Sequence, residues 1–152
     1  MNVVIDTNIW ISALISKDGL SRDIIRLALN DEISPQISTT LFLEYETVMK
    51  REKIQNLCSL DIIEQNELFQ AFLSTCKWNE IFYLWRPNLN DEDDDFLIEL
   101  AVASNSEVII TDNKKDINSG ELKFKFEVLT PQEFLERNKN EHSHTKNTRF
   151  KI

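Results

Sequence analysis

Glycine, proline and cysteine are scarce in this chain of 152 residues, which contains two Gly, three Pro and two Cys. So little glycine and proline argues against a loop-built or low-complexity protein. The two cysteines, Cys58 and Cys76, are too few and too unpatterned for a disulfide framework or a zinc site, and they indicate a reducing compartment. No apolar run approaches the length of a membrane span, and a strand-like segment follows Met1 without room for a signal peptide. The sequence therefore predicts a cytoplasmic protein that does not enter the membrane.

Hydrophobic residues make up 41% of the chain and charged residues 28%, which fits one globular domain with a real core. The net charge is −9, and five of the acidic residues lie together in residues 91–95 (DEDDD). Without these five, the chain has 21 acidic and 17 basic residues. A globally acidic protein repels polyanions at long range. Any role with nucleic acid therefore has to use local Lys and Arg side chains and metal ions, which argues against a simple nucleic-acid-binding module.

The hydrophobic pattern alternates between short β-type runs and helical segments. Strands are predicted at residues 2–5, 33–38, 107–111 and 127–129, with a further strand or extended connection at 81–85. Helices are predicted at residues 9–15, 21–30 (capped by Ser21), 39–51 (capped by Thr39 or Thr40), 60–76 and 93–103, with a short last helix opening at Thr130-Pro131. This alternation predicts an α/β fold with a central, mostly parallel sheet and helices on both faces.

Residues 138–152 (NKNEHSHTKNTRFKI) are polar, unpatterned and basic in an otherwise acidic chain. We expect one domain over residues 1–137 and a disordered C-terminal tail over 138–152 without a catalytic role; contact with RNA or a partner is the alternative. The three tryptophans, Trp10, Trp78 and Trp85, are expected in the core rather than as platforms for stacking bases.

Acidic residues stand at the points where a parallel sheet builds sites, beyond the carboxyl ends of its strands. Asp6 ends the first buried strand, and Thr111-Asp112-Asn113 ends another; the acidic pentad opens the helix that precedes this second strand. Glu44 falls on the border of its helix's apolar stripe. Taken singly, an Asx turn explains Asp6 and the helix dipole explains the pentad. Their common position at one edge of the sheet favours a shared site.

Several carboxylates at one edge repel each other, at a cost of about 4 kcal/mol for two charges 4 Å apart at an effective dielectric near 20. A bound cation relieves that repulsion. Oxygen ligands without clustered His or Cys suit Mg²⁺ or Mn²⁺ rather than zinc. Such an ion activates water and stabilises the entering and leaving oxygens at phosphorus, so the pattern points to phosphodiester hydrolysis.

The same segments resemble the four motifs of the PIN-domain nucleases. Residues 3–14 (VVIDTNIWISAL) resemble the first motif, and residues 40–44 (TLFLE) with Val48 and Arg51 resemble the second. Residues 91–113 (DEDDDFLIELAVASNSEVIITDN) resemble the third and fourth together. The resemblance spans about residues 1–135, and the order and spacing are similar to those of VapC-like toxins of bacterial toxin–antitoxin systems. It implies a three-layer α/β/α Rossmann-like fold, Mg²⁺- or Mn²⁺-dependent ribonuclease activity, an antitoxin partner and a homodimer.

The resemblance also implies roles for individual residues. Asp6, Glu44 and Asp95 match the three acids that hold the metal, and a one-residue difference in the loop would replace Asp95 by Asp94. Thr7 and Asn8 match the polar residues that support the first acid, Asp6, and Thr111 matches the threonine that ends the strand of the fourth motif.

Asn113 stands where many relatives have a fourth Asp. Its amide oxygen can ligate a metal but brings no charge, which weakens a second metal position, although Asp112 or Asp116 in the same loop could compensate. Whether the site holds one ion or two therefore stays open. The alternative function is a catalytically weak or inactive PIN-like domain that binds RNA or regulates.

Contact with RNA near the acidic edge requires cations, and the candidates are Arg51, Lys114 and Lys115; the ordinary explanation is that they are solvated helix ends. A third class, phosphoryl-transfer domains of the haloacid-dehalogenase or receiver type, fits poorly. The former requires Asp where Asn8 stands, and the latter requires an acidic pair at the first strand and a phosphoacceptor Asp on a middle strand, a pattern that this sequence lacks.

Overall fold

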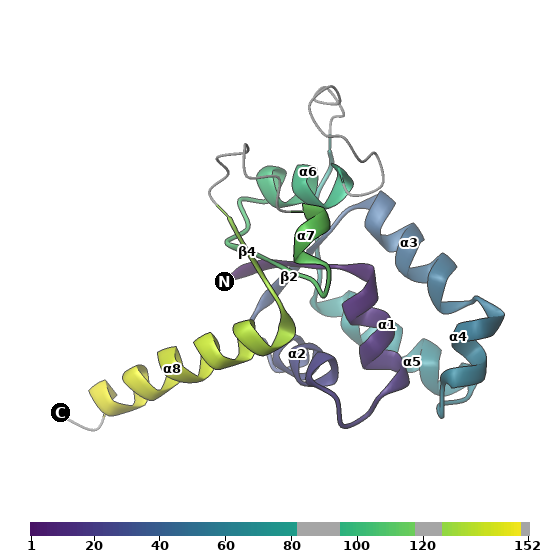
Figure 1. Cartoon of the computed structure of the whole chain (residues 1–152), viewed down its shortest axis with the longest axis horizontal. Coiled ribbons are helices and arrows are strands. Elements are labelled where there is room, and N and C mark those ends of the chain that lie inside the picture. Colours follow the sequence, from purple (N-terminus) through teal and green to yellow (C-terminus); the bar gives the residue numbers. More distant parts are fainter. Residues whose placement is uncertain (82–94, 118–125, 150–152) are drawn as a thin grey trace.

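The structure, a computed structural model, consists of a five-stranded sheet with helices on both faces (Figure 1). It describes residues 1–81, 95–117 and 126–149. Within these ranges the side chains of Asp95, Lys115, Asp116 and residues 142–149 are not described.

All strand pairings of the sheet are parallel, in the order β3-β2-β1-β4-β5. The strands are β1 (Asn2–Ile5), β2 (Ser34–Ile37), β3 (Lys77–Trp78), β4 (Val108–Ile110) and β5 (Glu127–Leu129). The chain extends the sheet from β1 to one side through β2 and to the other through β4. The strand order therefore reverses at β1 and β4, and open α/β sheets build their sites beyond the carboxyl ends of the strands at such a point.

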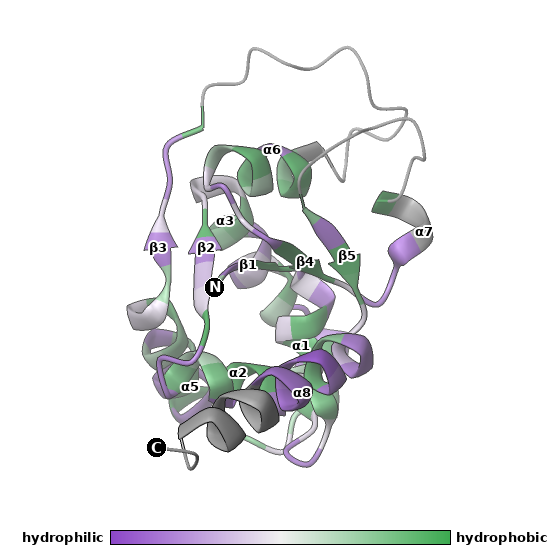
Figure 2. Ribbon diagram, turned by 90° about the vertical axis from the view of Figure 1, so that its left-hand side faces the viewer, coloured by the Kyte–Doolittle hydropathy of each residue, from purple (hydrophilic) through white to green (hydrophobic). Residues whose placement is uncertain are grey.

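Eight helices occur in the described part of the chain. They are α1 (Thr7–Ile15), α2 (Leu20–Leu29), α3 (Thr39–Met49), α4 (Glu52–Leu57), α5 (Ile62–Thr75), α6 (Asp95–Ala103), α7 (Lys114–Ile117) and α8 (Pro131–Arg149). Figure 2 shows α6 on one side of the sheet and α1, α2, α5 and α8 on the other. The predicted α/β fold is confirmed, with the predicted strands 2–5, 33–38, 107–111 and 127–129 each containing an observed strand.

The N-caps of α2 and α3 differ from those that the sequence predicted. Gly19 is the N-cap of α2, so Ser21 lies inside that helix and is buried rather than capping it. Ser38, and not a threonine, caps α3, and its side chain accepts a hydrogen bond from the backbone N–H of Leu41 at 3.2 Å. Thr39 already belongs to the helix. Ser, Thr and Gly all serve as caps, so residue type alone does not choose among neighbouring candidates.

Three short elements were not predicted. Strand β3 has two residues, paired with Gln36 and Ile37 at the edge of the sheet. Helix α4 has six residues and follows α3, and α7 has four residues and follows β4. Segments this short carry no readable period. The strand or extended connection expected at 81–85 lies outside the described residues apart from Ile81.

Helix α8 is much longer than the short helix that was expected, because it continues to Arg149. Disorder from residue 138 onward is therefore wrong for residues 138–149, which extend away from the sheet as helix (Figure 1). No Gly or Pro follows Pro131 in this helix to end it. The division into a domain over 1–137 and a tail over 138–152 stays a prediction.

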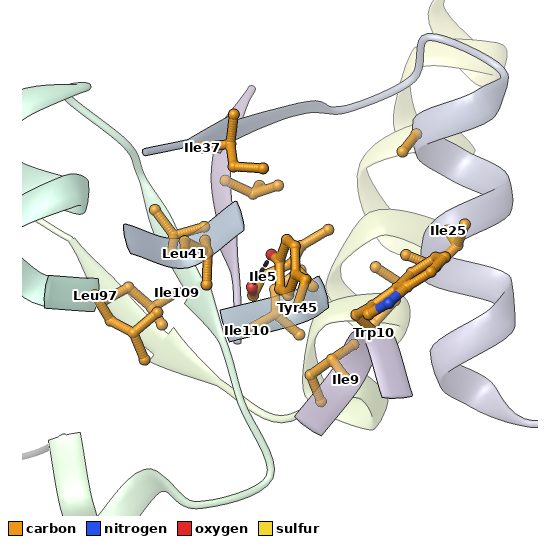
Figure 3. Packing of buried hydrophobic residues seen from close by; sticks show 14 of the residues in the cluster. Ile5, Ile9, Trp10, Ile25, Ile37, Leu41, Tyr45, Leu97, Ile109 and Ile110 are labelled. Atoms are coloured by element: carbon orange, nitrogen blue, oxygen red, sulfur yellow. Dashed lines mark hydrogen bonds between the residues drawn. The ribbon is translucent and has the colours of Figure 1, made fainter. Parts of the chain in front are cut away.

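Aromatic rings from α1, α3 and α5 form a cluster in the core. Figure 3 shows two of its members, Trp10 and Tyr45. Trp10 is fully buried, stacks on Phe72 with ring centroids 5.1 Å apart, and lies 5.2 Å from Phe69. The core position predicted for Trp10 is confirmed. Trp78 is 51% exposed at the sheet edge, where it packs on Phe42, so the core prediction is wrong for this residue. Trp85 lies outside the described residues.

Both cysteines are free, in agreement with the absence of a disulfide framework. Among the described helices, none is both long enough and apolar enough to cross a bilayer.

Alkaline pH is expected to destabilise the protein partly through Cys76. Burial raises the pKa of Cys76 from 9.0 to about 12, against a smaller opposing effect of the hydrogen bond with Thr75. The unfolded thiol ionises from about pH 9 while the folded thiol stays protonated, so the unfolding free energy falls between pH 9 and 12. At pH 10 this group accounts for a loss of about 1 kcal/mol. Urea unfolding at pH 8 and pH 10 should show a smaller loss in Cys76→Ala; an equal loss would contradict the assignment.

Candidate active site

Asp6 is the first residue beyond the carboxyl end of β1, the strand that pairs with β4. Its backbone N–H donates to the carbonyl oxygen of Ile110 at 3.0 Å, and its own carbonyl accepts from the N–H of Ile9 at 3.0 Å. Asp6 is the N-cap of α1, yet its side chain makes no capping hydrogen bond. The carboxylate is 8% exposed and is directed to another partner, so the turn interpretation does not account for it.

That partner is Thr111, at the carboxyl end of the neighbouring strand β4. The Thr111 hydroxyl donates to Oδ2 of Asp6 at 2.7 Å and accepts from the backbone N–H of Asn113 at 3.1 Å. Thr111 is fully buried. Since the hydroxyl is occupied as donor and acceptor, the orientation of the Asp6 carboxylate is well defined.

Glu44, on α3, lies beside the same strand end. Its Oε1 accepts a hydrogen bond from the hydroxyl of Thr7 at 2.9 Å. The resemblance had implied that Thr7 supports the first acid, Asp6; the hydroxyl instead contacts the second acid. Glu44 is half-buried, as its place on the border of the apolar stripe of α3 indicated. Two buried threonines thus each hold one carboxylate at the carboxyl end of β1.

Tyr45 is a site residue that the sequence did not single out. Its hydroxyl donates to the carbonyl oxygen of Ile5, the residue before Asp6, and the ring is 1% exposed. Burial raises the pKa of Tyr45 well above 10.0, and the charges of Cys76, Asp6 and Glu44 raise it further. The hydroxyl therefore remains a donor at neutral pH. The signal in the sequence that could have identified Tyr45 was its place directly after Glu44, because a tyrosine there brings a hydroxyl group close to that acid.

Three of the other predicted acids have no described side chain. Asp95 is the first residue of α6, a helix that packs on β1, and Asp116 lies in α7; Asp94 lies outside the described residues. Among the side chains that the structure describes, no group of three or more His, Cys, Asp or Glu could hold a metal ion. The described part of the site therefore supplies Asp6 and Glu44 only.

The remaining polar candidates are exposed. Asn8 lies on the surface of α1, and Asp112 and Asn113 lie in the loop after β4. Asp112 lines an open hollow of about 430 Å³, together with residues of α1, α2 and the start of α8 (Ser12, Ser16, Gly19, Leu20, Ser21, Thr130, Pro131 and Gln132).

Of the cations proposed for RNA contact, Lys114 already has a partner. Its ammonium group lies 3.0 Å from Oε1 of Glu133 on α8, and this hydrogen bond is the main reason that the pKa of Glu133 is lowered. Arg51 is exposed at the N-cap of α4, and the side chain of Lys115 is not described.

The family model described as the PIN domain matches residues 2–115. The chain belongs to the PIN-domain family. This match confirms, at the level of the family, the resemblance seen in the four motifs. PIN domains are generally nucleases.

Two further comparisons cover most of the chain. It is 28% identical over 152 positions to the uncharacterised protein MJ1680 of Methanocaldococcus jannaschii, covering 90% of each protein. It is also similar to a crystal structure of VapBC2 from Rickettsia felis bound to a DNA fragment from its promoter. That match has a TM-score of 0.54 and 19% identity, and covers 86% of this chain and 98% of the other. At this identity the likeness shows the fold.

Proposed function

We propose that this PIN domain is a metal-dependent endoribonuclease that hydrolyses RNA phosphodiester bonds. The observation that carries the proposal is the pair Asp6 and Glu44, held at the carboxyl end of β1 by the hydroxyls of Thr111 and Thr7. Hydroxyl donors are neutral, so these two hydrogen bonds leave the negative charge of both carboxylates in place.

The donor chemistry fits a hard divalent cation. Carboxylate oxygens at a strand end, without His or Cys beside them, suit Mg²⁺ or Mn²⁺. A carboxylate accepts several contacts through two oxygens, so the threonine bonds orient the acids without excluding a cation. Asp6, Glu44 and Asp95 would hold the ion, with Asp94 as the substitute for Asp95 and Asn113 as a neutral ligand. When bound, it supplies an activated water and stabilises charge on the phosphate oxygens.

The residues of the chain orient this site and accept its protons. Thr111 directs the carboxylate of Asp6, and Thr7 directs that of Glu44. Asp116, in α7, is the further acid that we assign to catalysis. Both histidines, at positions 142 and 144, belong to the far part of α8. Proton transfer is therefore assigned to the acids. Lys115 and Arg51 are the cations that we assign to the RNA backbone; Lys114 would first have to leave Glu133.

The biological role that we propose is the toxin of a toxin–antitoxin pair, acting in the cytoplasm as a homodimer with a cognate antitoxin as partner. The order and spacing of the four motifs support this, as does the likeness in fold to VapBC2. Co-purification of this chain with the product of a small neighbouring reading frame would test the partnership.

Cleavage of defined single-stranded RNAs in Mg²⁺, in Mn²⁺ and in EDTA tests the activity. We expect cleavage with either metal, none in EDTA, and recovery when metal is added back. Single-stranded DNA of the same sequence is the matched substrate and should be cleaved far more slowly. Metal binding by calorimetry without cleavage of any RNA would instead identify the second candidate, a PIN domain that binds or regulates. Asn113 favours that candidate because it contributes no charge to a second metal position.

A further inference from the structure

The peptide unit between Ile5 and Asp6 is held at both ends. Its carbonyl oxygen accepts a hydrogen bond from the hydroxyl of Tyr45, and its N–H donates to the carbonyl of Ile110 at 3.0 Å. One bond comes from α3 and the other from β4, on opposite sides of β1. Because a peptide unit is planar and rigid, two such bonds define its orientation and hence the direction of the Asp6 side chain. Figure 3 shows Tyr45 meeting Ile5 at this point.

The hydrogen bond between Tyr45 and Ile5 also affects the position of the second acid, Glu44. Tyr45 follows Glu44 in α3, so a contact that ties Tyr45 to β1 also sets how far Glu44 lies from the strand end. The ring is fixed in the core, with its centroid 6.0 Å from that of Phe72 and 6.4 Å from that of Trp10. A rigid ring with a buried hydroxyl thus joins the backbone beside both carboxylates.

We infer that Tyr45 is a positioning residue, whose hydroxyl sets the spacing of Asp6 and Glu44 for a divalent cation. The inference rests on the proposed function, because it concerns the same pair of acids. Tyr45 acts through the backbone of Ile5 and through its neighbour Glu44, and does not itself contact the metal or the RNA.

Tyr45→Phe keeps the ring and removes only the hydroxyl, which leaves the Ile5 carbonyl without this donor. We expect Mn²⁺ to bind the full chain about tenfold or more weakly, the range found when an outer contact of a metal ligand is lost. Titration followed by electron paramagnetic resonance measures this directly, without RNA. In cleavage assays at saturating metal, kcat should fall more than KM for RNA changes. Incorporation of 4-aminophenylalanine at position 45 returns a donor and should restore much of the affinity.

Ser104→Ala is the matched control, because it also removes a buried hydroxyl that donates to a backbone carbonyl. Ser104 Oγ donates to Leu100 O at 2.7 Å, and Ser104 O accepts from Asn2 at the start of β1, the end opposite the site. We expect this variant to lose stability but keep the Mn²⁺ affinity of the unmodified chain.

The outcomes separate the two proposals. Unchanged Mn²⁺ affinity in Tyr45→Phe, or an equal loss in Ser104→Ala, would overturn the positioning role while the proposed function stands. Failure of the unmodified chain to bind Mn²⁺ would overturn both. If circular dichroism shows that Tyr45→Phe does not fold, the chain with 4-aminophenylalanine at position 45 tests the role instead. This side chain keeps a hydrogen-bond donor for the Ile5 carbonyl. A folded chain of this kind that binds Mn²⁺ tenfold more weakly would also reject the positioning role.

Discussion

Asp6→Asn is expected to abolish metal-dependent RNA cleavage and to leave the fold intact. The substitution removes the negative charge of Asp6, the proposed metal ligand at the end of β1, while keeping the size of the side chain. Loss of an outer partner of a metal ligand already costs about 10- to 100-fold in affinity or activity. Loss of the ligand charge itself should therefore reduce cleavage by more than about a hundredfold, measured on a single-stranded RNA in Mg²⁺.

The fold should survive this change because the local contacts of Asp6 can persist. An Asn amide oxygen can accept the hydrogen bond from Thr111, and the backbone bond to Ile110 does not involve the side chain. In EDTA the variant should be at least as stable to urea as the unmodified chain, since one of two neighbouring negative charges is gone. Cleavage that persists in Asp6→Asn would remove the proposed mechanism.

Asp31→Asn is the matched control for Asp6→Asn. Asp31 is exposed just after α2, and its φ of 58° is a conformation that Asn also tolerates. The control makes the same chemical change outside the site and should cleave RNA at the rate of the unmodified chain. An equal loss of activity in both variants would indicate a general effect of charge.

Trp10→Ala is expected to lower the free energy of unfolding by about 3–5 kcal/mol. Trp10 is fully buried and stacks on Phe72, and Phe69 packs on it at 5.2 Å. Truncation leaves a large cavity between α1 and α5 that rigid neighbours cannot fill. Since domains of this size are stable by about 5–15 kcal/mol, the variant should be close to unfolding, and its urea midpoint should fall steeply.

Trp10→Phe separates ring packing from hydrogen bonding. Among the described residues, the indole N–H of Trp10 has no hydrogen-bond partner. A phenyl ring therefore retains most of the packing, and the substitution removes no hydrogen bond. We expect the free energy of unfolding to fall by less than half of the loss in Trp10→Ala. If both variants lost the same free energy of unfolding, stacking with Phe72 would not be what Trp10 contributes.

The parts of the fold that could be predicted are those with a local signal. Val3, Val4 and Ile5 form an apolar run with no helical period, and the structure makes them the fully buried centre of the sheet. Parallel strands end at the same edge, so the meeting of Asp6 with Thr111, 105 residues apart, follows from the topology. The gathering of the other predicted acids at this edge stays a prediction.

The parts that could not be predicted depend on neighbours distant in the chain or on segments too short to show a period. Ser38 and Thr39 are both acceptable caps by residue type, and the geometry at the end of β2 selects Ser38. Strand β3 exists because β2 offers it a pairing edge, and its two residues carry no pattern. Helix α8 continues through polar residues whose composition alone indicated disorder.

By itself, the sequence determined the α/β class and the parallel sheet, because hydrophobic periodicity and strand direction are local properties. Only the tertiary structure decided which oxygen each hydroxyl meets. Thr7 contacts Glu44, 37 residues away, and Tyr45 contacts Ile5, 40 residues away. A hydrogen bond forms only within a few tenths of an ångström, and that accuracy comes from the packing of α3 against α1, where Tyr45 lies beside Trp10.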